Sequence, residues 1–340
     1  MILTLNCGSQ SVVIAAFEGE ELKEEVSLND LTDKNYKSKL ESKLDELGDK
    51  YSPETVGHRV VHGGEEFRES IVLDEENIKK LEKFNHLAPL HNPKNLMGIR
   101  AAKEIFNEAT QVAVFDTQFY GDLPIEAYQY GLPEEIREKY GFRRFGFHGI
   151  SHEYASKKAA EKAGLEFNKS KIISAHLGGG CSVTAIKNGK AVDTSMGHTP
   201  LEGVVMMTRS GDVDPGIVLE LAKNEGIEET DTLLNKESGM KGLAGTQNML
   251  EIINKSKKGD KRSQLAMKVF SYRVKKYISA YYGVMGGVDL ISFTGSIGNG
   301  DPKTRSMILK DLPFAEEAKV VGVKPNEELA IAKKVEKLLD

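Results

Sequence analysis

The sequence predicts an α/β protein of two domains, organised around two similar strand–turn–strand units. The first unit opens the chain, where an apolar run over residues 2–5 precedes a small polar turn and a second apolar run over residues 12–17. The second unit lies at the centre, where an apolar run over residues 172–175 precedes three glycines and a β-rich run over residues 181–186. This repeated order indicates an internal duplication, and 340 residues are enough for two domains.

The glycines of the central turn suggest how such units bind ligands. A glycine turn lets the backbone bend sharply, and its amides can form a concavity that holds an anion. Two such turns facing each other would hold a phosphate chain, although two ordinary hairpins explain the same pattern. After the second strand, Asn188-Gly189 is a strong hairpin signal.

Composition restricts the classes of partner. The net charge of −5 provides no basic surface for nucleic acid. The N-terminus lacks the pattern of a signal peptide, and no apolar run approaches the length of a membrane span. Two cysteines in the whole chain argue against a disulfide scaffold, and Cys7 and Cys181 are expected to be buried thiols. We therefore expect a cytoplasmic protein with small-molecule partners, no nucleic acid and no membrane association.

The N-terminal half predicts strands that end in polar residues. The charged stretch up to residue 49 predicts one exposed helix with loops, and residues 55–62 predict a strand. Helices are predicted over residues 74–84, capped by Asp74, and over residues 93–106, capped by Asn92. A strand over residues 111–115 ends at Asp116, which is the position where open α/β sheets place ligand-binding groups.

The C-terminal half continues the alternation of strands and helices, which is typical of α/β proteins. We expect a domain boundary near residue 120. A strand is predicted over residues 288–294, and residues 238–247 predict a loop with three glycines. The helix over residues 263–282 is expected to be long and largely buried. The remaining predicted helices cover residues 133–140, 151–163, 215–224, 303–310 and 326–339.

Several common catalytic motifs are absent from the sequence. There is no G-x-x-x-x-G-K-[ST], no G-x-G-x-x-G between a strand and a helix, and no G-x-S-x-G. Two histidine pairs have a spacing of four, His58 with His62 and His148 with His152, but the first pair falls in a predicted strand. Neither pair has the glutamate of H-E-x-x-H, so we do not expect a zinc site.

The polar residues that remain are typical of phosphoryl transfer. They are two arginines in polar contexts, Arg59 and Arg209, with histidines beside glycines and carboxylates at the ends of elements. Arginines, charge-stabilising donors and carboxylates that hold a divalent ion are the parts that such enzymes use. For either arginine alone a structural salt bridge is the favoured interpretation, so the hypothesis depends on the combination.

Longer motifs make the sequence resemble the acetate kinase family. In the order of that family, the chain contains GHRVVHGGE from residue 57, LAPLHNP from 87, AVFDTQFY from 113, RRFGFHGISH from 143, HLGGGCSVTAIKNGKAVDTSMGHTPLEG from 176, TRSGDVDP from 208 and PNEELAIA from 325. The resemblance implies two duplicated actin-like (ribonuclease H-like) domains with a cleft between them. Residues 1–118 with 328–340 would form the first domain, and residues 119–327 would form the second, which carries most of the donor site.

The resemblance also implies roles for individual residues. Arg59 and Arg209 match the arginines that hold the acyl carboxylate and the phosphoryl group, His148 the histidine that stabilises the transition state, and Asp116 the essential aspartate. The magnesium-site residues would be Asn6 and Glu327. The substrate site would further include Val61, Leu90, His91, Phe147 and Pro200, and the phosphate or nucleotide site His176, Leu177, Gly178, Gly179, Gly180, Ile297 and Gly298.

The activity implied is the reversible transfer of a phosphoryl group from ATP to acetate, which gives acetyl phosphate and ADP, by in-line transfer with Mg²⁺. Acetate has a pKa of roughly 4 to 5 and is ionised at neutral pH, so no general base is needed. Asp116 is therefore expected to orient an arginine or the water shell of the metal. A homodimer is implied by the resemblance alone.

The chain departs from the family mainly on the nucleotide side. Serine and lysine of the first hairpin are replaced by Gln10 and Val13, Asp-Phe-Arg by residues 249–251, and Gly-Ile-Gly-Glu-Asn by residues 296–300. The changed positions in the last two motifs include Met249, Leu250, Glu251, Ser296, Asn299 and Gly300, and further differences are Ile150, Gly179, Cys181 and His198. Two alternatives therefore stay open: the same acyl chemistry with pyrophosphate or phosphate, or a non-catalytic ligand-binding module on this fold.

Overall fold

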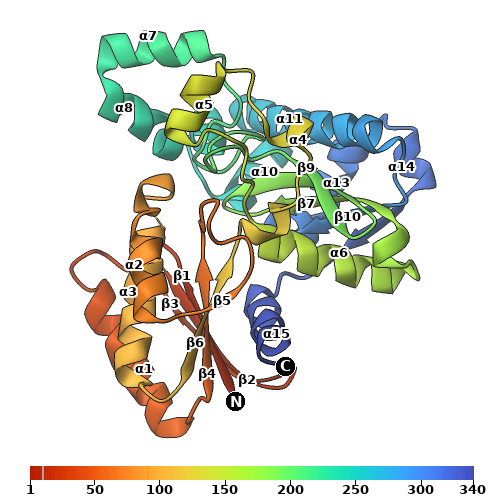
Figure 1. Cartoon of the computed structure of the whole chain (residues 1–340). Coiled ribbons are helices and arrows are strands. Elements are labelled where there is room, and N and C mark those ends of the chain that lie inside the picture. The colour runs from red at the N-terminus through yellow and green to blue at the C-terminus, as the bar shows by residue number, and fades with distance from the viewer. Residues whose placement is uncertain (10, 90) are drawn as a thin grey trace. The chain divides into compact units, whose positions relative to one another are not determined.

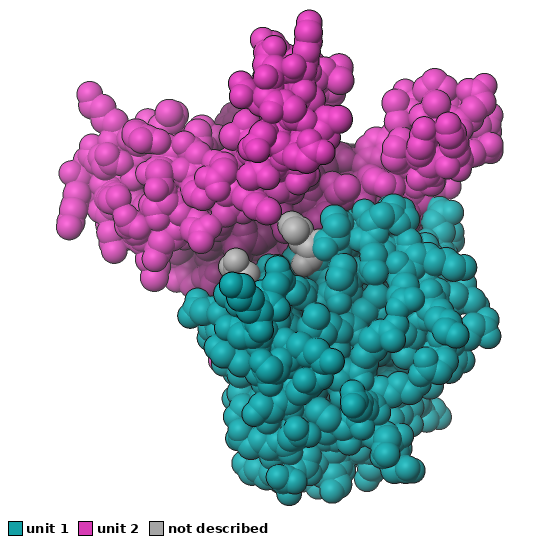
Figure 2. Space-filling view, turned by 90° about the vertical axis from the view of Figure 1, so that its left-hand side faces the viewer, with its two compact units in different colours: residues 1–121, 326–340 teal, residues 122–325 magenta. Residues whose placement is uncertain are grey.

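A computed structural model describes residues 1–9, 11–89 and 91–340. The chain forms two compact units (Figures 1 and 2). Unit 1 contains residues 1–121 and 326–340, and unit 2 contains residues 122–325. Each unit has its own β-sheet, so the mixed α/β class and the two-domain organisation predicted from the sequence are confirmed.

Unit 1 is built on a six-stranded sheet with the order β3-β2-β1-β4-β6-β5. Its strands are β1 (Ile2–Cys7), β2 (Val12–Glu18), β3 (Glu21–Leu28), β4 (Thr55–Val60), β5 (Ile71–Val72) and β6 (Thr110–Phe115). The first three strands form an antiparallel meander, whereas β1, β4 and β6 run parallel. The parallel strands therefore all end at the same edge of the sheet.

Helices cover both faces of this sheet. They are α1 (Tyr36–Lys50), α2 (Glu75–Glu82), α3 (Asn92–Ile105) and α15 (Glu327–Leu339). On one face, Leu40 and Leu44 of α1 pack with Leu3 and Leu5 of β1. On the opposite face, alternate residues of β2 pack against α15, as Phe17 does with Ala332 (Figure 1). Burial of both faces explains why almost every residue of the parallel strands is buried, including polar residues such as His58 and Gln111.

Unit 2 repeats the topology of unit 1. Its sheet has the order β11-β10-β7-β8-β9. The strands are β7 (Lys171–Leu177), β8 (Cys181–Lys187), β9 (Lys190–Thr194), β10 (Leu290–Thr294) and β11 (Lys319–Gly322). The meander β7-β8-β9 corresponds to β1-β2-β3, and the parallel strands β10 and β11 correspond to β4 and β6. The internal duplication predicted from the two strand–turn–strand units is thus confirmed.

The helices of unit 2 include two that pack directly on its sheet. α6 (Gly149–Ala163) packs against β7 and β10, and α11 (Lys261–Met285) packs against β7 and β8. The others are α4 (Ile125–Tyr128), α5 (Glu134–Tyr140), α7 (Pro215–Glu225), α8 (Ile227–Thr232), α9 (Gly239–Ala244), α10 (Met249–Lys257), α12 (Gly295–Gly300), α13 (Pro302–Leu309) and α14 (Phe314–Glu317). In the described part of the chain, no helix combines the length and the hydrophobicity that a bilayer span requires.

Two predictions for unit 1 were wrong in detail. The charged stretch before residue 50 contains the edge strand β3, and α1 is amphipathic rather than exposed, because a leucine at every third or fourth position faces the core. Asn92 does not cap α3. It lies within the helix, where its Oδ1 accepts a hydrogen bond from the N–H of His62 at 3.1 Å and its Nδ2 donates to the carbonyl of His62 at 2.9 Å.

Two predictions for unit 2 also failed. Residues 238–247 contain the helix α9, because Gly239 and Gly245 begin and end that helix with φ angles of 62° and 79° rather than forming a loop. Helix α11 is longer than predicted and is not buried all round. Leu265 and Tyr272, which contributed to the predicted pattern, are 55% and 61% exposed.

Candidate functional site

The polar groups of unit 1 gather where its parallel strands end. Asn6 lies near the end of β1, Arg59 near the end of β4, and Asp116 directly follows β6. Because β4 is hydrogen-bonded to both β1 and β6, these three residues occupy adjacent positions at one sheet edge. The N-terminal end of α15 brings Glu327 to the same edge, since Asn6 hydrogen-bonds to it.

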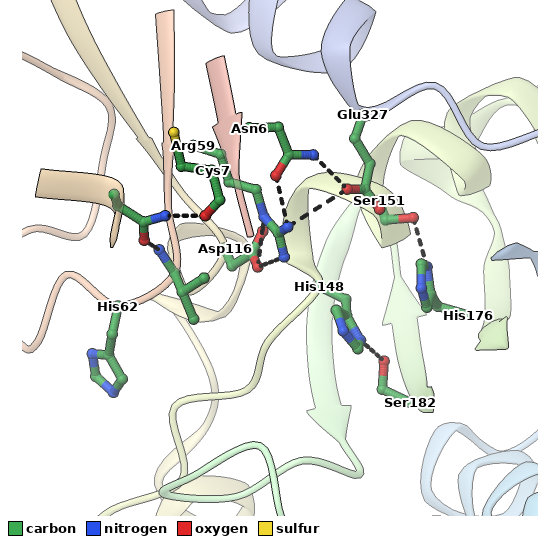
Figure 3. A network of polar contacts seen from close by, with 12 residues as sticks. Asn6, Cys7, Arg59, His62, Asp116, His148, Ser151, His176, Ser182 and Glu327 are labelled. Atoms are coloured by element: carbon green, nitrogen blue, oxygen red, sulfur yellow. Dashed lines mark hydrogen bonds and ion pairs between the residues drawn. The ribbon is translucent and has the colours of Figure 1, made fainter. Parts of the chain in front are cut away.

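Arg59 is the centre of this cluster (Figure 3). Its Nε lies 3.2 and 3.1 Å from Oδ1 and Oδ2 of Asp116, and its Nη2 lies 2.6 Å from Oδ2. Its Nη1 donates to Oδ1 of Asn6 at 2.9 Å and lies 3.9 Å from the Glu327 carboxylate. Burial by itself would lower the pKa of Arg59, but the charges of Asp116 and then Glu327 outweigh it and raise that pKa.

A second glutamate belongs to this cluster and was missed in the sequence. Asn6 Nδ2 donates to Glu328 Oε1 at 3.1 Å and to Glu327 Oε2 at 3.4 Å. Burial raises the pKa of Glu328, and the negative charge of Glu327 adds to that rise. The sequence did contain a signal for this second acidic residue, namely two consecutive glutamates in the first turn of a predicted helix.

These carboxylates fit a magnesium ion. Mg²⁺ keeps several water ligands and typically takes one or two protein carboxylates together with phosphates of the substrate. Within the described residues, no group of three or more His, Cys, Asp or Glu side chains could enclose a metal ion. Glu327 and Glu328, with Asn6 between them, provide the smaller set, and a divalent cation would relieve the repulsion that raises the pKa of Glu328.

The predicted acyl-pocket residues of unit 1 follow β4 and precede α3. Val61 is buried, and its N–H donates to Oδ1 of Asn95 at 3.1 Å. Asn95 Nδ2 in turn donates to the carbonyl of Cys7 at 2.8 Å, so this asparagine, missed in the sequence, joins the ends of β1 and β4. His91 occupies the N-cap position of α3. Leu90 and Gln10 lie outside the described residues.

In unit 2, His148 lies beside the glycine turn between β7 and β8. It adopts a left-handed conformation, with a φ of 59°, immediately before α6. Its Nδ1 contacts Ser182 Oγ at 2.9 Å, and its ring stacks on His176 with 4.4 Å between the centroids (Figure 3). A Cβ on Gly180 would lie 3.0 Å from His148 Nε2 and 3.6 Å from Arg209 Nη1. The edge of His148, Gly180 and Arg209 are therefore direct neighbours.

Arg209 differs from Arg59 in having no acidic partner among the residues that the structure describes. Its Nη1 contacts the carbonyl of Pro200 at 3.4 Å and Met206 Sδ at 3.8 Å, and no carboxylate of the described residues lies within ion-pair distance of it. Burial lowers the pKa of Arg209. A largely buried guanidinium without a carboxylate is costly unless an anion compensates its charge. Of the other predicted substrate residues in unit 2, Phe147 is buried next to His148.

The remaining predicted phosphate-site residues gather at the ends of β7 and β10. Leu177 ends β7, and the N–H of Gly178 donates to the carbonyl of Gly180 at 3.0 Å. Gly298 lies in α12, where a Cβ would be 3.4 Å from the side chain of Leu177. Arg305, missed in the sequence, donates to the carbonyls of Gly298 and Asn299 at 2.7 Å each. Gly179 lies within the glycine turn, and Ile297 within α12.

The unusual stretch 249–251 begins helix α10. Asn248 caps this helix by accepting from the N–H of Glu251 at 3.2 Å. The Glu251 carboxylate accepts from Thr246 Oγ1 at 2.8 Å and pairs with Lys255 at 2.6 Å. Leu250 is 72% exposed. The Glu251 side chain thus makes its contacts locally, at the start of α10, and part of its charge is already balanced within the helix.

The structure also shows the surroundings of the two cysteines and of the two histidine pairs. Cys7 and Cys181 are buried, as expected, and burial raises the pKa of each thiol to about 12. His58 contacts Gln111 Oε1 at 2.8 Å. His148 and His152 do lie one helical turn apart, but both contact the hydroxyl of Ser182.

The chain is similar in sequence to acetate kinases. The model of the Acetokinase family matches residues 35–337. The acetate kinase of Thermosipho melanesiensis is 46% identical over 327 residues, which cover 88% of this chain and 80% of that protein. The acetate kinase of Thermoanaerobacter pseudethanolicus is 42% identical and covers 99% of this chain and 98% of its own length. That alignment spans 395 positions against the 340 residues here, so this chain lacks segments that the relative contains.

Solved structures give the same result for the fold. The crystal structure of Porphyromonas gingivalis acetate kinase superposes with a TM-score of 0.90 at 37% identity, over 100% of this chain and 99% of that one. A propionate kinase from Francisella tularensis gives a TM-score of 0.87 at 35% identity, over 98% of both chains. The ROK hexokinase of Thermus thermophilus, at 11% identity and a TM-score of 0.51, shares the fold alone.

Proposed function

This chain belongs to the acetokinase family, and on that basis we propose that it transfers a phosphoryl group from ATP to acetate, reversibly, to give acetyl phosphate and ADP. The observation that carries this proposal is Arg209, a largely buried guanidinium that has no carboxylate partner in the described chain. Its neighbours, the glycine turn and His148, add hydrogen-bond donors beside that charge. Such a group of donors suits a transferred phosphoryl group.

Acetate is the nucleophile in this proposal, and it needs no deprotonation. Its carboxylate is already ionised at neutral pH, so the main barrier is the approach of one anion to another. Arg59 and Arg209 supply positive charge to these anions, and His148 donates a hydrogen bond to the phosphoryl group in the transition state. Asp116 acts as an orienting group, because both of its carboxylate oxygens are engaged by Arg59.

Mg²⁺ is part of the proposal. Glu327 and Glu328 would hold it, together with Asn6, in a shell completed by water and phosphate oxygens. When bound, the ion supplies charge neutralisation to the donor phosphates. The contacts between Asn6 and both carboxylates support this assignment, since they keep the two acidic groups together at the end of β1.

ATP is the donor that we propose, because the family resemblance includes it. The local contacts of the Glu251 carboxylate with Thr246 and Lys255 support this choice, because they weaken the repulsion between that carboxylate and a nucleotide. Pyrophosphate is the alternative donor, since the departures at Val13 and at residues 249–251 and 296–300 lie on the nucleotide side. A cytoplasmic location and a homodimer complete the proposal, and light scattering of the purified protein would measure the oligomeric state.

A hydroxylamine-trapping assay for acetyl phosphate tests the activity. The wild-type protein with acetate, Mg²⁺ and ATP should form acetyl hydroxamate, and Arg209→Ala should lower turnover by roughly 10²-fold, the scale of losing one charge-stabilising donor. Arg137→Ala is the matched control, because that arginine lies on α5, is only partly buried and donates to the carbonyl of Leu132. Formation of no acetyl phosphate with ATP or pyrophosphate would refute the proposed activity and favour a non-catalytic ligand-binding module.

A further inference from the structure

A chain of hydrogen bonds extends from His148 into the interior of unit 2. His148 Nδ1 lies 2.9 Å from Ser182 Oγ, and the same oxygen lies 2.7 Å from His152 Nε2. On its other side, His152 Nδ1 lies 2.9 Å from Ser174 Oγ. The chain therefore links four side chains in the order His148, Ser182, His152 and Ser174.

The local structure explains why these residues meet. The N–H of His152 donates to the carbonyl of His148 at 2.9 Å in the first turn of α6, so the two histidines lie on one side of that helix. On the sheet, Ser182 of β8 is directly opposite His176 of β7, and Ser174 lies two residues before His176. Ser174, His176 and Ser182 therefore share the face of the sheet that meets α6.

Each inner member of the chain is closed off from solvent. Ser174, Ser182 and His152 are fully buried. Burial lowers the pKa of His152 well below its ordinary value, and the neighbouring His176 lowers it further. His152 is therefore neutral, with one N–H and one acceptor nitrogen. In the described part of the chain, the hydroxyls of Ser174 and Ser182 have no hydrogen-bond partners other than these histidine nitrogens.

Counting hydrogens leaves one satisfactory arrangement. If His152 carried its hydrogen on Nδ1, it would donate to Ser174, and the Ser174 O–H would have no acceptor in the interior. If His148 and His152 both donated to Ser182, the Ser182 O–H would have no acceptor. A buried donor without an acceptor destabilises the folded protein. Every hydrogen finds an acceptor only when Ser174 donates to His152 Nδ1, His152 Nε2–H donates to Ser182, and Ser182 donates to His148 Nδ1.

We propose that Ser174, His152 and Ser182 together hold neutral His148 as the tautomer whose hydrogen is on Nε2, and that His152 is thus a positioning residue for His148. Nε2 is the nitrogen at Gly180, where Arg209 Nη1 also lies. This chain of hydrogen bonds therefore directs the Nε2–H of His148 toward the glycine turn. The catalytic use of this donor rests on the proposed phosphoryl transfer, whereas the tautomer does not depend on it.

Nitrogen-15 NMR of the histidine rings tests the tautomer directly. In wild-type protein labelled with [¹⁵N]histidine, at a pH where His148 is neutral, Nε2 should show the shift of a protonated ring nitrogen and Nδ1 that of an acceptor nitrogen. Ser182→Ala and Ser174→Ala should each convert His148 toward a mixture of tautomers. His152→Gln, whose amide still donates toward Ser182, should retain the wild-type tautomer, and His152→Phe should not. A hydrogen on Nδ1 in the wild type, or an unchanged tautomer in both serine variants, would overturn the proposal.

Kinetics supply the second readout. Ser182→Ala should lower kcat roughly ten- to hundredfold, the range seen when the hydrogen bond that orients a functional histidine is removed at metal sites, with the KM for acetate changed less than about twofold. Ser271→Ala is the matched control. It removes a buried hydroxyl of unit 2 that has no partner in the described chain, and it should change neither the tautomer nor kcat.

The two proposals can fail separately. Wild-type protein that forms no acetyl phosphate while His148 keeps its hydrogen on Nε2 would remove the proposed function and leave the tautomer assignment standing. If the wild-type protein is active and Ser182→Ala has the same kcat, the positioning role of this chain of hydrogen bonds would be overturned.

Discussion

Arg59 donates to the buried carboxylate of Asp116 through two nitrogens, with Nε 3.1 Å and Nη2 2.6 Å from Oδ2. Asp116 is only 2% exposed, and the charge of this arginine stabilises its carboxylate in the interior. The third nitrogen, Nη1, donates to Asn6, which fixes the plane of the guanidinium. The pair therefore has a structural role in addition to the role that we propose for it in binding anions.

Replacing Arg59 should cost both stability and activity. Arg59→Met would remove the guanidinium that both oxygens of the buried Asp116 carboxylate contact, and breaking a buried pair in this way costs about 3–5 kcal/mol. Turnover should fall by roughly 10²-fold or more, and lysine should restore little, because it cannot make the paired contacts of a guanidinium. Urea denaturation measures the stability change, with the exposed Arg68→Met as control; a loss below about 1 kcal/mol would contradict the prediction.

Arg209 should show the opposite effect on stability. Burial disfavours the charged form of this arginine, as its lowered pKa indicates, and no carboxylate compensates it in the described chain. Arg209→Met should therefore leave the free energy of unfolding unchanged or increase it, while turnover falls roughly 10²-fold. Thermal unfolding and the hydroxamate assay on one preparation check both effects. A clear decrease in Tm would imply an internal role for this charge.

Val61 should limit the length of the acid that is used. Its side chain is buried behind the end of β4, and its backbone is held by Asn95. Val61→Ala should improve butyrate relative to acetate, by about 1 to 3 kcal/mol per methylene accommodated. The measurement is the ratio of kcat/KM for the two acids, with Val72→Ala, an exposed valine of the same unit, as control. An unchanged ratio would show that Val61 does not line the pocket.

The charge of Glu251 should have only a small effect on nucleotide use. This carboxylate is partly balanced by Lys255 and is accessible to salt, so its repulsion is screened. Glu251→Gln should lower the KM for ATP by no more than about threefold and leave that for pyrophosphate unchanged. Comparing kcat/KM for ATP, GTP and pyrophosphate identifies the donor. Turnover with pyrophosphate but not with ATP would replace the proposed donor.

His58 should make unit 1 sensitive to acid. Burial lowers the pKa of His58 from 6.5 to about 4, although its contact with Gln111 opposes the shift. The unfolded chain then binds a proton that the folded chain does not, so this contribution to stability is complete above pH 6.5 and is lost as the pH falls toward 4. Up to about 3 kcal/mol is involved. The difference in unfolding free energy between wild type and His58→Gln should therefore shrink over this range; a constant difference would contradict the assignment.

The local features of the fold could be predicted from sequence. Strand–turn–strand units depend on neighbouring residues, so the β1-β2 and β7-β8 pairs and the Asn188-Gly189 hairpin follow from apolar runs and turn residues, whereas the charged edge strand β3 does not. Helix N-termini were predictable where a side chain caps its own helix, as Asp74 does for α2. The same reasoning failed at Gly239 and Gly245, because a glycine that ends a helix and a glycine in a loop look alike in a sequence.

The family motifs identified the candidate residues, whereas only the tertiary structure determined their partners. Asn6 and Glu327 are 321 positions apart, and their contact requires α15 to return to the first sheet. The hydrogen on His148 depends on Ser182, 34 positions away, and on a histidine that the sequence spacing associated with zinc. The carboxylate partner of Arg59 follows from the order of the parallel strands, which places Asp116 beside it, whereas Arg209 has no carboxylate partner among the described residues. Charge pairing and proton position depend on distances between chain-remote atoms, and a linear pattern of residue types does not contain them.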